Sequence, residues 1–124
     1  WLKQKSPSLI ISGGAQGMDT WAGKAAIKIG IPFDLYVPFP GQGDNWPDHA
    51  KEDLNILKEK SRNIILCSET YHKRCFFIRD EKMIDDCDEV ASLLKPGVTK
   101  GGTFYTVNYA KKLNKPIQNF WKDE

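Results

Sequence analysis

The fold of this chain is decided by residues 9–19, which read LIISGGAQGMD. The apolar run 9–12 has the length and composition of a short buried strand, and glycines follow it directly. From Met18 onward apolar residues recur at helical spacing as far as Ile29, and Gly30 is a stop signal. A strand that turns through glycines into a helix predicts the first unit of an α/β domain.

Four further strands and three further helices are expected along the chain. Strands are predicted at residues 33–37, 64–66, 90–94 and 116–121, and helices at residues 48–60, 76–87 and 103–113. Strands that are apolar on both faces are typical of a parallel sheet covered by helices. We therefore predict a doubly wound α/β domain with a mainly parallel sheet. In such sheets ligands bind outside the carboxyl ends of the strands, so the loops that follow the strands are the candidate site.

Length and composition exclude several classes of protein. The 124 residues suit a single domain, the 11% aromatic content excludes a disordered chain, and three scattered cysteines exclude a disulfide scaffold. No apolar run approaches the ~20 residues that cross a bilayer, so no membrane partner is expected. An odd cysteine count without a leading signal peptide predicts a cytoplasmic protein. The net charge of +2 argues against a strongly electrostatic nucleic-acid binder.

The cysteines do not form a recognisable chemical motif. Cys67, Cys75 and Cys87 lack the CxxC spacing of metal ligands, so no metal site is expected. Cys67 ends a strand and is interpreted as a small buried residue. Cys75 is the best candidate for a reactive thiol, because the basic residues 72–74 precede it, but an inert loop cysteine is favoured.

The loop at residues 12–19 has the chemistry of an anion site. Its small residues let the backbone approach a ligand, and the helix after it presents free N–H groups at its positive end. The candidate contacts are Gly13, Gly14, Ala15, Gly17 and Asp19. The carboxylate could accept hydrogen bonds from a ribose or a base. Alternatively, the glycines only permit the turn, and the carboxylate only complements the helix dipole.

A second glycine loop, residues 96–103, reads PGVTKGGT and also opens a helix. Lys100 could supply a point charge beside Gly101 and Gly102, and Thr103 could donate to a phosphate or cap the helix. Two such loops favour a phosphate-bearing ligand. Neither loop is the GxGxxG of dinucleotide binders or the GxxxxGK[ST] of nucleoside triphosphatases, so no resident cofactor is expected.

Two other features could complete the site. Phe39 and Trp46 lie in a Gly- and Pro-rich loop after the second strand, where either could stack on a base or pack against the next helix. Arg79 is one of three arginines and could bind a phosphate or carboxylate through two N–H groups. On spacing alone, a surface ion pair with a neighbouring acid such as Asp80 is favoured for this arginine.

Taken in order, these motifs resemble the SLOG superfamily of Rossmann-like nucleotide-ligand binders. Residues 12–22 resemble the SGGAxGxDxxA signature of the SMF/DprA-type DNA-processing proteins. Residues 79–88, followed by a strand and the GGT of residues 101–103, resemble the RxxxMxxxSD…GGxGT pattern of the LOG family. The same stretch is similar to the RNxxMVDxSD of YpsA-like proteins. The likeness extends from residue 9 to residue 117.

The resemblance implies a Rossmann-like fold with a ligand crevice between the two glycine loops. It implies that a phosphate lies in the second loop, and that Arg79 is nearby. LOG phosphoribohydrolases have a catalytic glutamate after this loop, whereas residues 104–107 here read FYTV. This departure disfavours phosphoribohydrolase chemistry.

The leading hypothesis is binding of a nucleotide or nucleotide-derived ligand, as a sensor or carrier, with no catalytic residue assigned. The first alternative is hydrolysis of the N-glycosidic bond of a nucleoside monophosphate, with Arg79 on the phosphate and Asp19 or Glu89 as the acid. The second alternative is single-stranded DNA binding through a basic face. That face would consist of Lys24, Lys28, Lys73, Arg74 and Lys100. A homodimer is left open.

The resemblance also bears on the domain boundaries. Members of the superfamily begin with an additional strand, central in their sheet, and a helix before the SGGA strand, and residues 1–5 look like the end of that helix. We therefore expect residues 1–124 to be most of one SLOG-type domain, with the N-terminal segment cleaved, unresolved or supplied by another chain.

Overall fold

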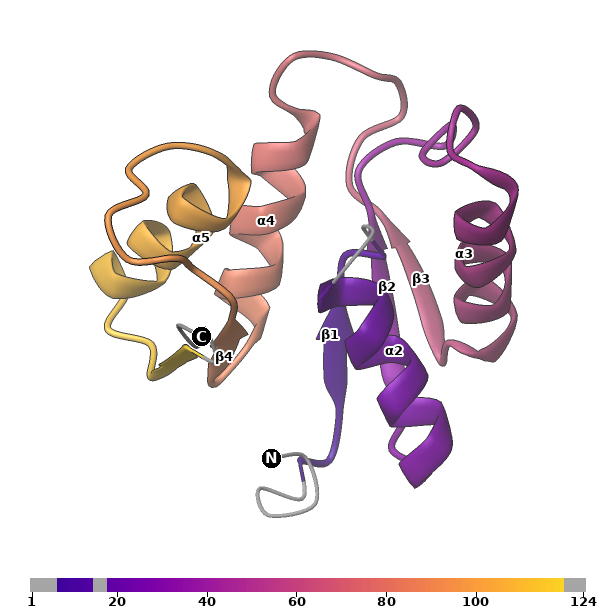
Figure 1. Cartoon of the computed structure of the whole chain (residues 1–124), viewed down its shortest axis with the longest axis horizontal. Helices are drawn as coiled ribbons and strands as arrows, with labels where there is room; N and C mark the ends of the chain where they lie inside the picture. The colour runs from indigo at the N-terminus through magenta and orange to yellow at the C-terminus, as the bar shows by residue number, and fades with distance from the viewer. Residues whose placement is uncertain (1–6, 15–17, 120–124) are drawn as a thin grey trace.

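The structure is a computed structural model that describes residues 7–14 and 18–119, and this part has five strands alternating with four helices (Figure 1). Rossmann-like α/β alternation is thus confirmed. The end of the last predicted strand, at Trp121, lies outside the described residues. In chain order the elements are β1 (Ile10–Ser12), α2 (Met18–Ile29), β2 (Phe33–Val37), α3 (Asp48–Lys60), β3 (Asn63–Leu66), α4 (Cys75–Asp86), β4 (Val90–Ser92), α5 (Gly102–Lys112) and β5 (Ile117–Asn119).

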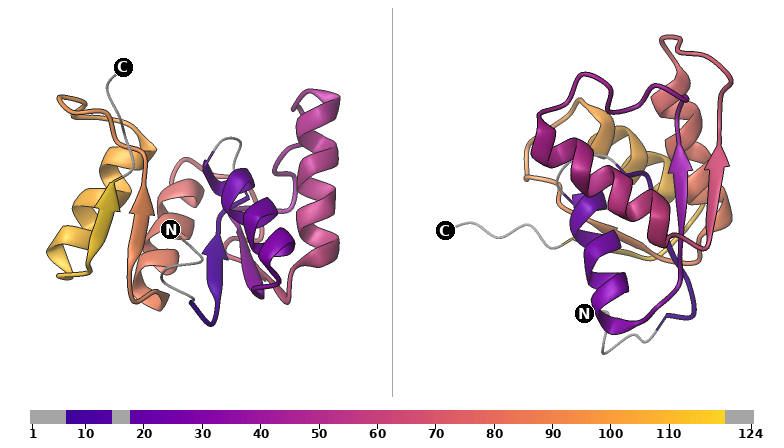
Figure 2. Two further views of the ribbon diagram at one scale, coloured as in Figure 1. Left: turned by 60° about the horizontal axis from the view of Figure 1, so that its bottom comes forward. Right: turned by 90° about the vertical axis from the view of Figure 1, so that its right-hand side faces the viewer.

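The strands form two parallel sheets, one in the order β1-β2-β3 and one made of β4 and β5. Their registers place Ile10 opposite Phe33 and Val90 opposite Ile117. The arrows of both sheets point the same way in Figure 2, so the loops after the strands gather at one end of the molecule. Figures 1 and 2 show α4 between the two sheets. The additional strand expected from the resemblance remains a prediction.

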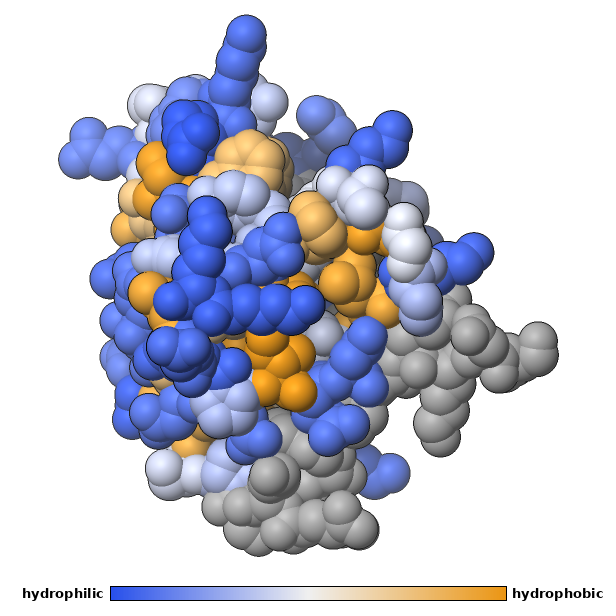
Figure 3. Space-filling model, turned by 90° about the vertical axis from the view of Figure 1, so that its left-hand side faces the viewer, coloured by the Kyte–Doolittle hydropathy of each residue, from blue (hydrophilic) through white to orange (hydrophobic). Residues whose placement is uncertain are grey.

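Each sheet has its own apolar core. The first core packs α2 and α3 against β1 and β2, and β2 is buried along its whole length. Its buried members are Ile10, Ala26, Phe33, Leu35, Val37, Leu54 and Leu57. The second core is smaller and consists of Ile84, Val90 and Ala110. Figure 3 shows the face on the side of α5 and β5, where hydrophilic side chains surround small apolar patches.

Two predictions of burial were wrong. The strand at β3 was expected to be covered on both faces, but Ile64 and Leu66 are about half exposed, at 51% and 49%. The reason is that β3 is an edge strand with β2 as its neighbour. On α2, the helical spacing of the apolar residues predicts one buried face that includes Trp21 and Ile29, but both are exposed.

The exposure of these two residues follows from a close approach of α2 to α3. A Cβ on Gly23 would lie 2.5 Å from Leu57 Cδ2, and Ala26 is fully buried one turn further along. Small residues therefore form the packed face of α2, and its largest side chains remain outside. In the described part of the chain, none of the helices is both long and apolar enough to cross a membrane.

The core of the first sheet can be tested at two neighbouring positions of α3. Leu57 is fully buried, whereas Ile56 is 38% exposed. We expect Leu57→Ala to lower the free energy of unfolding by about 2–5 kcal/mol, because it leaves a cavity, and Ile56→Ala to lower it by less than about 1 kcal/mol. Urea unfolding measures both, and equal losses would contradict the packing described here.

Candidate ligand-binding site

The first glycine loop is closed by Ser12 at the end of β1. Its buried Oγ donates to the backbone oxygen of Asp19 at 2.9 Å and accepts from the N–H of Gly14 at 3.2 Å. Gly14 has a φ of +69°, and a Cβ there would lie 2.9 Å from Leu35 Cδ1. The turn therefore requires a glycine at this position. Two other candidate residues of this loop, Ala15 and Gly17, lie outside the described residues.

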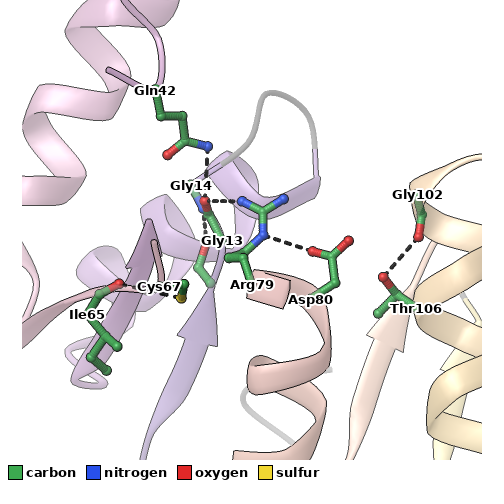
Figure 4. A network of polar contacts seen from close by, with 10 residues as sticks. Gly13, Gly14, Gln42, Ile65, Cys67, Arg79, Asp80, Gly102 and Thr106 are labelled. Carbon is green, nitrogen blue, oxygen red and sulfur yellow. Dashed lines mark hydrogen bonds and ion pairs between the residues drawn. The ribbon is translucent and has the colours of Figure 1, made fainter. Parts of the chain in front are cut away.

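Side chains from two other elements converge on the carbonyl oxygen of Gly13 (Figure 4). Arg79 of α4 donates to it from Nη1 at 2.9 Å, and Gln42, from the loop between β2 and α3, donates from Nε2 at 3.3 Å. A Cβ on Gly13 would lie 2.8 Å from Arg79 Nη1. The guanidinium thus fits against the loop because position 13 is a glycine.

Arg79 also forms an ion pair with the next residue, Asp80. Nε lies 2.8 Å from Oδ1, and the two side chains are only 7% and 14% exposed. The surface ion pair favoured from the sequence is therefore a buried one. Burial raises the pKa of Asp80, and this effect outweighs Arg79 and the Thr106 hydroxyl, which both lower it. A buried carboxyl with a raised pKa is suited to proton transfer, a role that sequence reasoning did not give to Asp80.

Helix α5, which follows the second glycine loop, meets this ion pair from the other side through Thr106, a hydrogen-bond partner of Asp80. Gly101, with a φ of +99°, precedes α5, and the hydroxyl of Thr106 donates to the backbone oxygen of Gly102 at 2.9 Å. In Figure 4, Gly102 and Thr106 lie on the opposite side of Arg79 and Asp80 from Gly13. The ion pair therefore lies between the two loops.

The suggestion that Thr103 caps α5 was wrong. Gly101 occupies the cap position, no side chain caps the helix, and Thr103 is an exposed residue of the first turn. Lys100 is exposed next to it. Because the cap residue, Gly101, provides no side-chain hydrogen bond to the first N–H groups of α5, these groups are suited to an anion.

Two hollows in the surface lie near the candidate site, and the second glycine loop lines one of them. One of about 540 Å³ lies between α4 and α5, and Lys100, Gly101 and Gly102 line it together with Phe77 and Tyr105. Another, of about 390 Å³, lies between the loop after β2 and α3, and Gln42 and Lys58 are among its lining residues. Of the two glycine loops, only the second lines the larger hollow, and neither hollow is lined by Gly13 or Gly14.

Gln42 is a site residue that sequence reasoning missed. It is 4% exposed, and its Oε1 has no hydrogen-bond partner within the part of the chain that the structure describes. A buried polar atom without a partner costs about 1–3 kcal/mol, so an acceptor left open beside the loop is suited to a ligand donor. The signal that could have identified it is a polar residue between two glycines in the loop after β2.

The aromatic and cysteine predictions are only partly correct. Trp46 packs against the first core and does not face a ligand, whereas Phe39 contacts the exposed ring of Tyr71. Cys75 is not a loop cysteine, because it is the fully buried first residue of α4. Cys67, expected to be buried, is half-buried, and burial raises the pKa of its thiol. Cys75 therefore lacks the exposure of a nucleophile, and Cys67 lacks the lowered pKa of one.

The remaining charged candidates are dispersed. Glu89 directly precedes β4, at the end of the sheet away from the glycine loops, which removes it as an acid for a reaction there. Asp19 lies in the first turn of α2, and Lys24 of the same helix pairs with Asp53 at 2.8 Å. Among the described residues, His, Cys, Asp and Glu form no group that could hold a metal ion.

The order of these elements and loops can be compared with known proteins. Residues 2–121 match the YpsA family, which is described as a SLOG family (YspA SLOG family). The chain belongs to this family. The SLOG resemblance drawn from the two glycine motifs is thereby confirmed.

A solved structure is also similar to this YpsA-family chain. It is a crystal structure of a protein from Syntrophus aciditrophicus SB that is named as a candidate molybdenum carrier, with 26% sequence identity and a TM-score of 0.60. The match covers 92% of this chain and 63% of that one, so this chain spans less than two thirds of that protein. Among curated proteins, none matches the present chain.

The buried ion pair predicts a pH-dependent loss of stability in Arg79→Met. Without the cation, the folded pKa of Asp80 rises further above its unfolded value. The folded chain then binds a proton more readily than the unfolded chain, so protonation stabilises the fold. We expect Arg79→Met to lower the free energy of unfolding by about 3–5 kcal/mol at pH 7.5. This loss should shrink as the pH falls toward 5.

Urea unfolding of the parent and the variant at both pH values measures this difference. The double variant Arg79→Met/Asp80→Asn is the control, because it has no titrating carboxyl at position 80 and should not regain stability on acidification as Arg79→Met does. An equal loss for Arg79→Met at both pH values would show that Asp80 is not paired with Arg79 as described.

Proposed function

We propose that this YpsA-family chain binds a nucleotide or nucleotide-derived ligand at its two glycine loops, as a sensor or carrier. The observation that carries the proposal is the buried pair Arg79–Asp80, which fixes the first loop through the carbonyl of Gly13 and meets Thr106 of α5, the helix that follows the second loop. Two loops on either side of one ion pair can bind two parts of one ligand.

Each loop offers groups of different chemistry. The second loop presents Lys100 and the uncapped N-terminus of α5, which suit the oxygens of a phosphate. The first loop presents its backbone and the open acceptor of Gln42, which suits a hydroxyl or amino donor of a ribose or base. A ligand with a phosphate at one end and donors at the other matches this division.

The structural relative suggests a different ligand for the same loops. Its name as a candidate molybdenum carrier points to an oxoanion such as molybdate, whose charged oxygens resemble those of phosphate. The second loop alone would be sufficient for such an ion. Molybdate is therefore the natural competitor of nucleotides in a binding experiment.

Hydrolysis of an N-glycosidic bond is the second candidate function, and Asp80 is the observation that favours it. Its raised pKa suits an acid that protonates the leaving base while water adds to the sugar carbon. Arg79 is less suited to hold the phosphate, because its Nε and Nη1 are bound within the protein. Single-stranded DNA binding has the least support, because Lys24 is paired and the other basic residues are divided among α2 and two loops.

Calorimetric titration with AMP, ADP-ribose, NAD and molybdate tests the proposed function. We expect binding of at least one nucleotide, weakened about tenfold in Lys100→Ala, since that variant removes one charge-assisted contact worth roughly 1.4 kcal/mol. Lys95→Ala is the matched control, because it removes an exposed lysine from the same loop.

Three outcomes separate the candidates. Molybdate binding without nucleotide binding would show that the ligand is an oxoanion and not a nucleotide. Free base released from AMP, and lost in Asp80→Asn, would establish the hydrolase. Folded protein that binds none of these compounds would contradict the proposal.

A further inference from the structure

Three aromatic rings form a cluster, called here the aromatic rim, at the carboxyl ends of β2 and β3. Phe39 follows β2, Tyr71 follows β3, and Phe76 lies in the first turn of α4. The rings meet edge to face, with centroid distances of 5.2 Å (Phe39–Tyr71), 5.8 Å (Phe39–Phe76) and 6.4 Å (Tyr71–Phe76). Residues distant in the sequence are thus assembled into one aromatic surface.

The rim faces solvent. Tyr71 is 64% exposed and Phe76 is 40% exposed. Edge-to-face packing holds each ring in a fixed orientation but leaves ring faces uncovered. Exposed aromatic surface is unfavourable in water, so its assembly at the ligand end of the sheet points to binding.

One side chain joins the rim to the glycine loop. The Arg79 guanidinium lies over the Phe76 ring, with its Cζ 5.8 Å from the ring centroid, and donates to the carbonyl of Gly13. This distance is within the range of a cation–π contact. The buried side chain of Arg79 therefore contacts both the rim and the first loop.

We infer that the aromatic rim is the base-binding part of the ligand site, with Tyr71 and Phe76 as the residues that stack on a nucleobase. The inference rests on the proposed function and extends it, since it makes the site selective for a ligand that carries a heteroaromatic ring. An inorganic oxoanion or a sugar phosphate would occupy the loops without using the rim. Stacking on aromatic side chains accepts any base, so the rim would not select one base strongly.

The test compares the four nucleoside 5′-monophosphates with ribose 5-phosphate, which is the same ligand without its base. In calorimetric titrations we expect the best nucleotide to bind about 10- to 100-fold more tightly than ribose 5-phosphate. Tyr71→Ala should remove much of this difference while ribose 5-phosphate binding stays unchanged, and Phe76→Ala should also reduce the preference for a nucleotide. Tyr71→Phe keeps the ring and should bind as the parent does. Ile56→Ala is the control. Ile56 lies in α3 and is 38% exposed, close to the exposure of Phe76, so this variant should leave nucleotide binding unchanged.

The outcomes separate this inference from the proposal on which it rests. If ribose 5-phosphate binds as tightly as every nucleotide, the rim is not a base site, although the loops still bind a phosphate. If the nucleotide preference survives both Ala variants, the base lies elsewhere and the inference is overturned. If neither kind of ligand binds, the proposed function and this inference both fail.

Discussion

The structure depends on one buried guanidinium. Arg79 donates to the carbonyl of Gly13 and pairs with Asp80, so a single side chain of α4 fixes the loop after β1. At the other end of α4, the hydroxyl of Tyr36 donates to Asp86 at 2.6 Å, and burial together with that carboxylate raises the pKa of Tyr36. Polar contacts at both ends therefore hold α4 against the first sheet. A buried ion pair holds its side chains in one geometry, and removing one partner strongly lowers the stability of the fold because the other charge is left buried and unpaired.

This arrangement explains how two sheets with separate cores can share one site. The two apolar clusters belong to different sheets, and α4 carries the contacts between them. Toward α5, Tyr109 donates to Asp85 at 2.7 Å, and the Phe77 and Tyr105 rings lie 4.5 Å apart. The second glycine loop is positioned by these contacts, so the distance between the loops is set by α4. Binding of a ligand that touches both loops would therefore depend on the position of α4.

Much of the fold could be predicted from the sequence because local signals agree there. α2, β2 and α3 have the predicted bounds, since helical periodicity, Gly30 and the prolines after β2 all mark the same boundaries. The glycine loops were located correctly for the same reason. Exposure was harder to predict, because it depends on which neighbour covers a face.

The parts of the site that sequence reasoning missed are those made by tertiary contacts. Gln42 and Asp80 are ordinary polar residues in the sequence and become notable only through burial beside Gly13 and Arg79. Cys75 resembles a loop cysteine next to basic residues, yet α4 begins there and buries it. Tyr71 and Phe76 lie five positions apart and join Phe39 only in the folded chain. Spacing along the chain contains none of this information.

The central claim is that two glycine loops, connected through Arg79, bind one nucleotide-type ligand. The most direct measurement is a titration of the ¹⁵N-labelled chain with AMP, followed through the backbone amide signals of Gly13, Gly14, Gly101 and Gly102. The account predicts that all four signals shift along one binding curve with a single dissociation constant. Shifts confined to one loop, or to residues far from both, would contradict it.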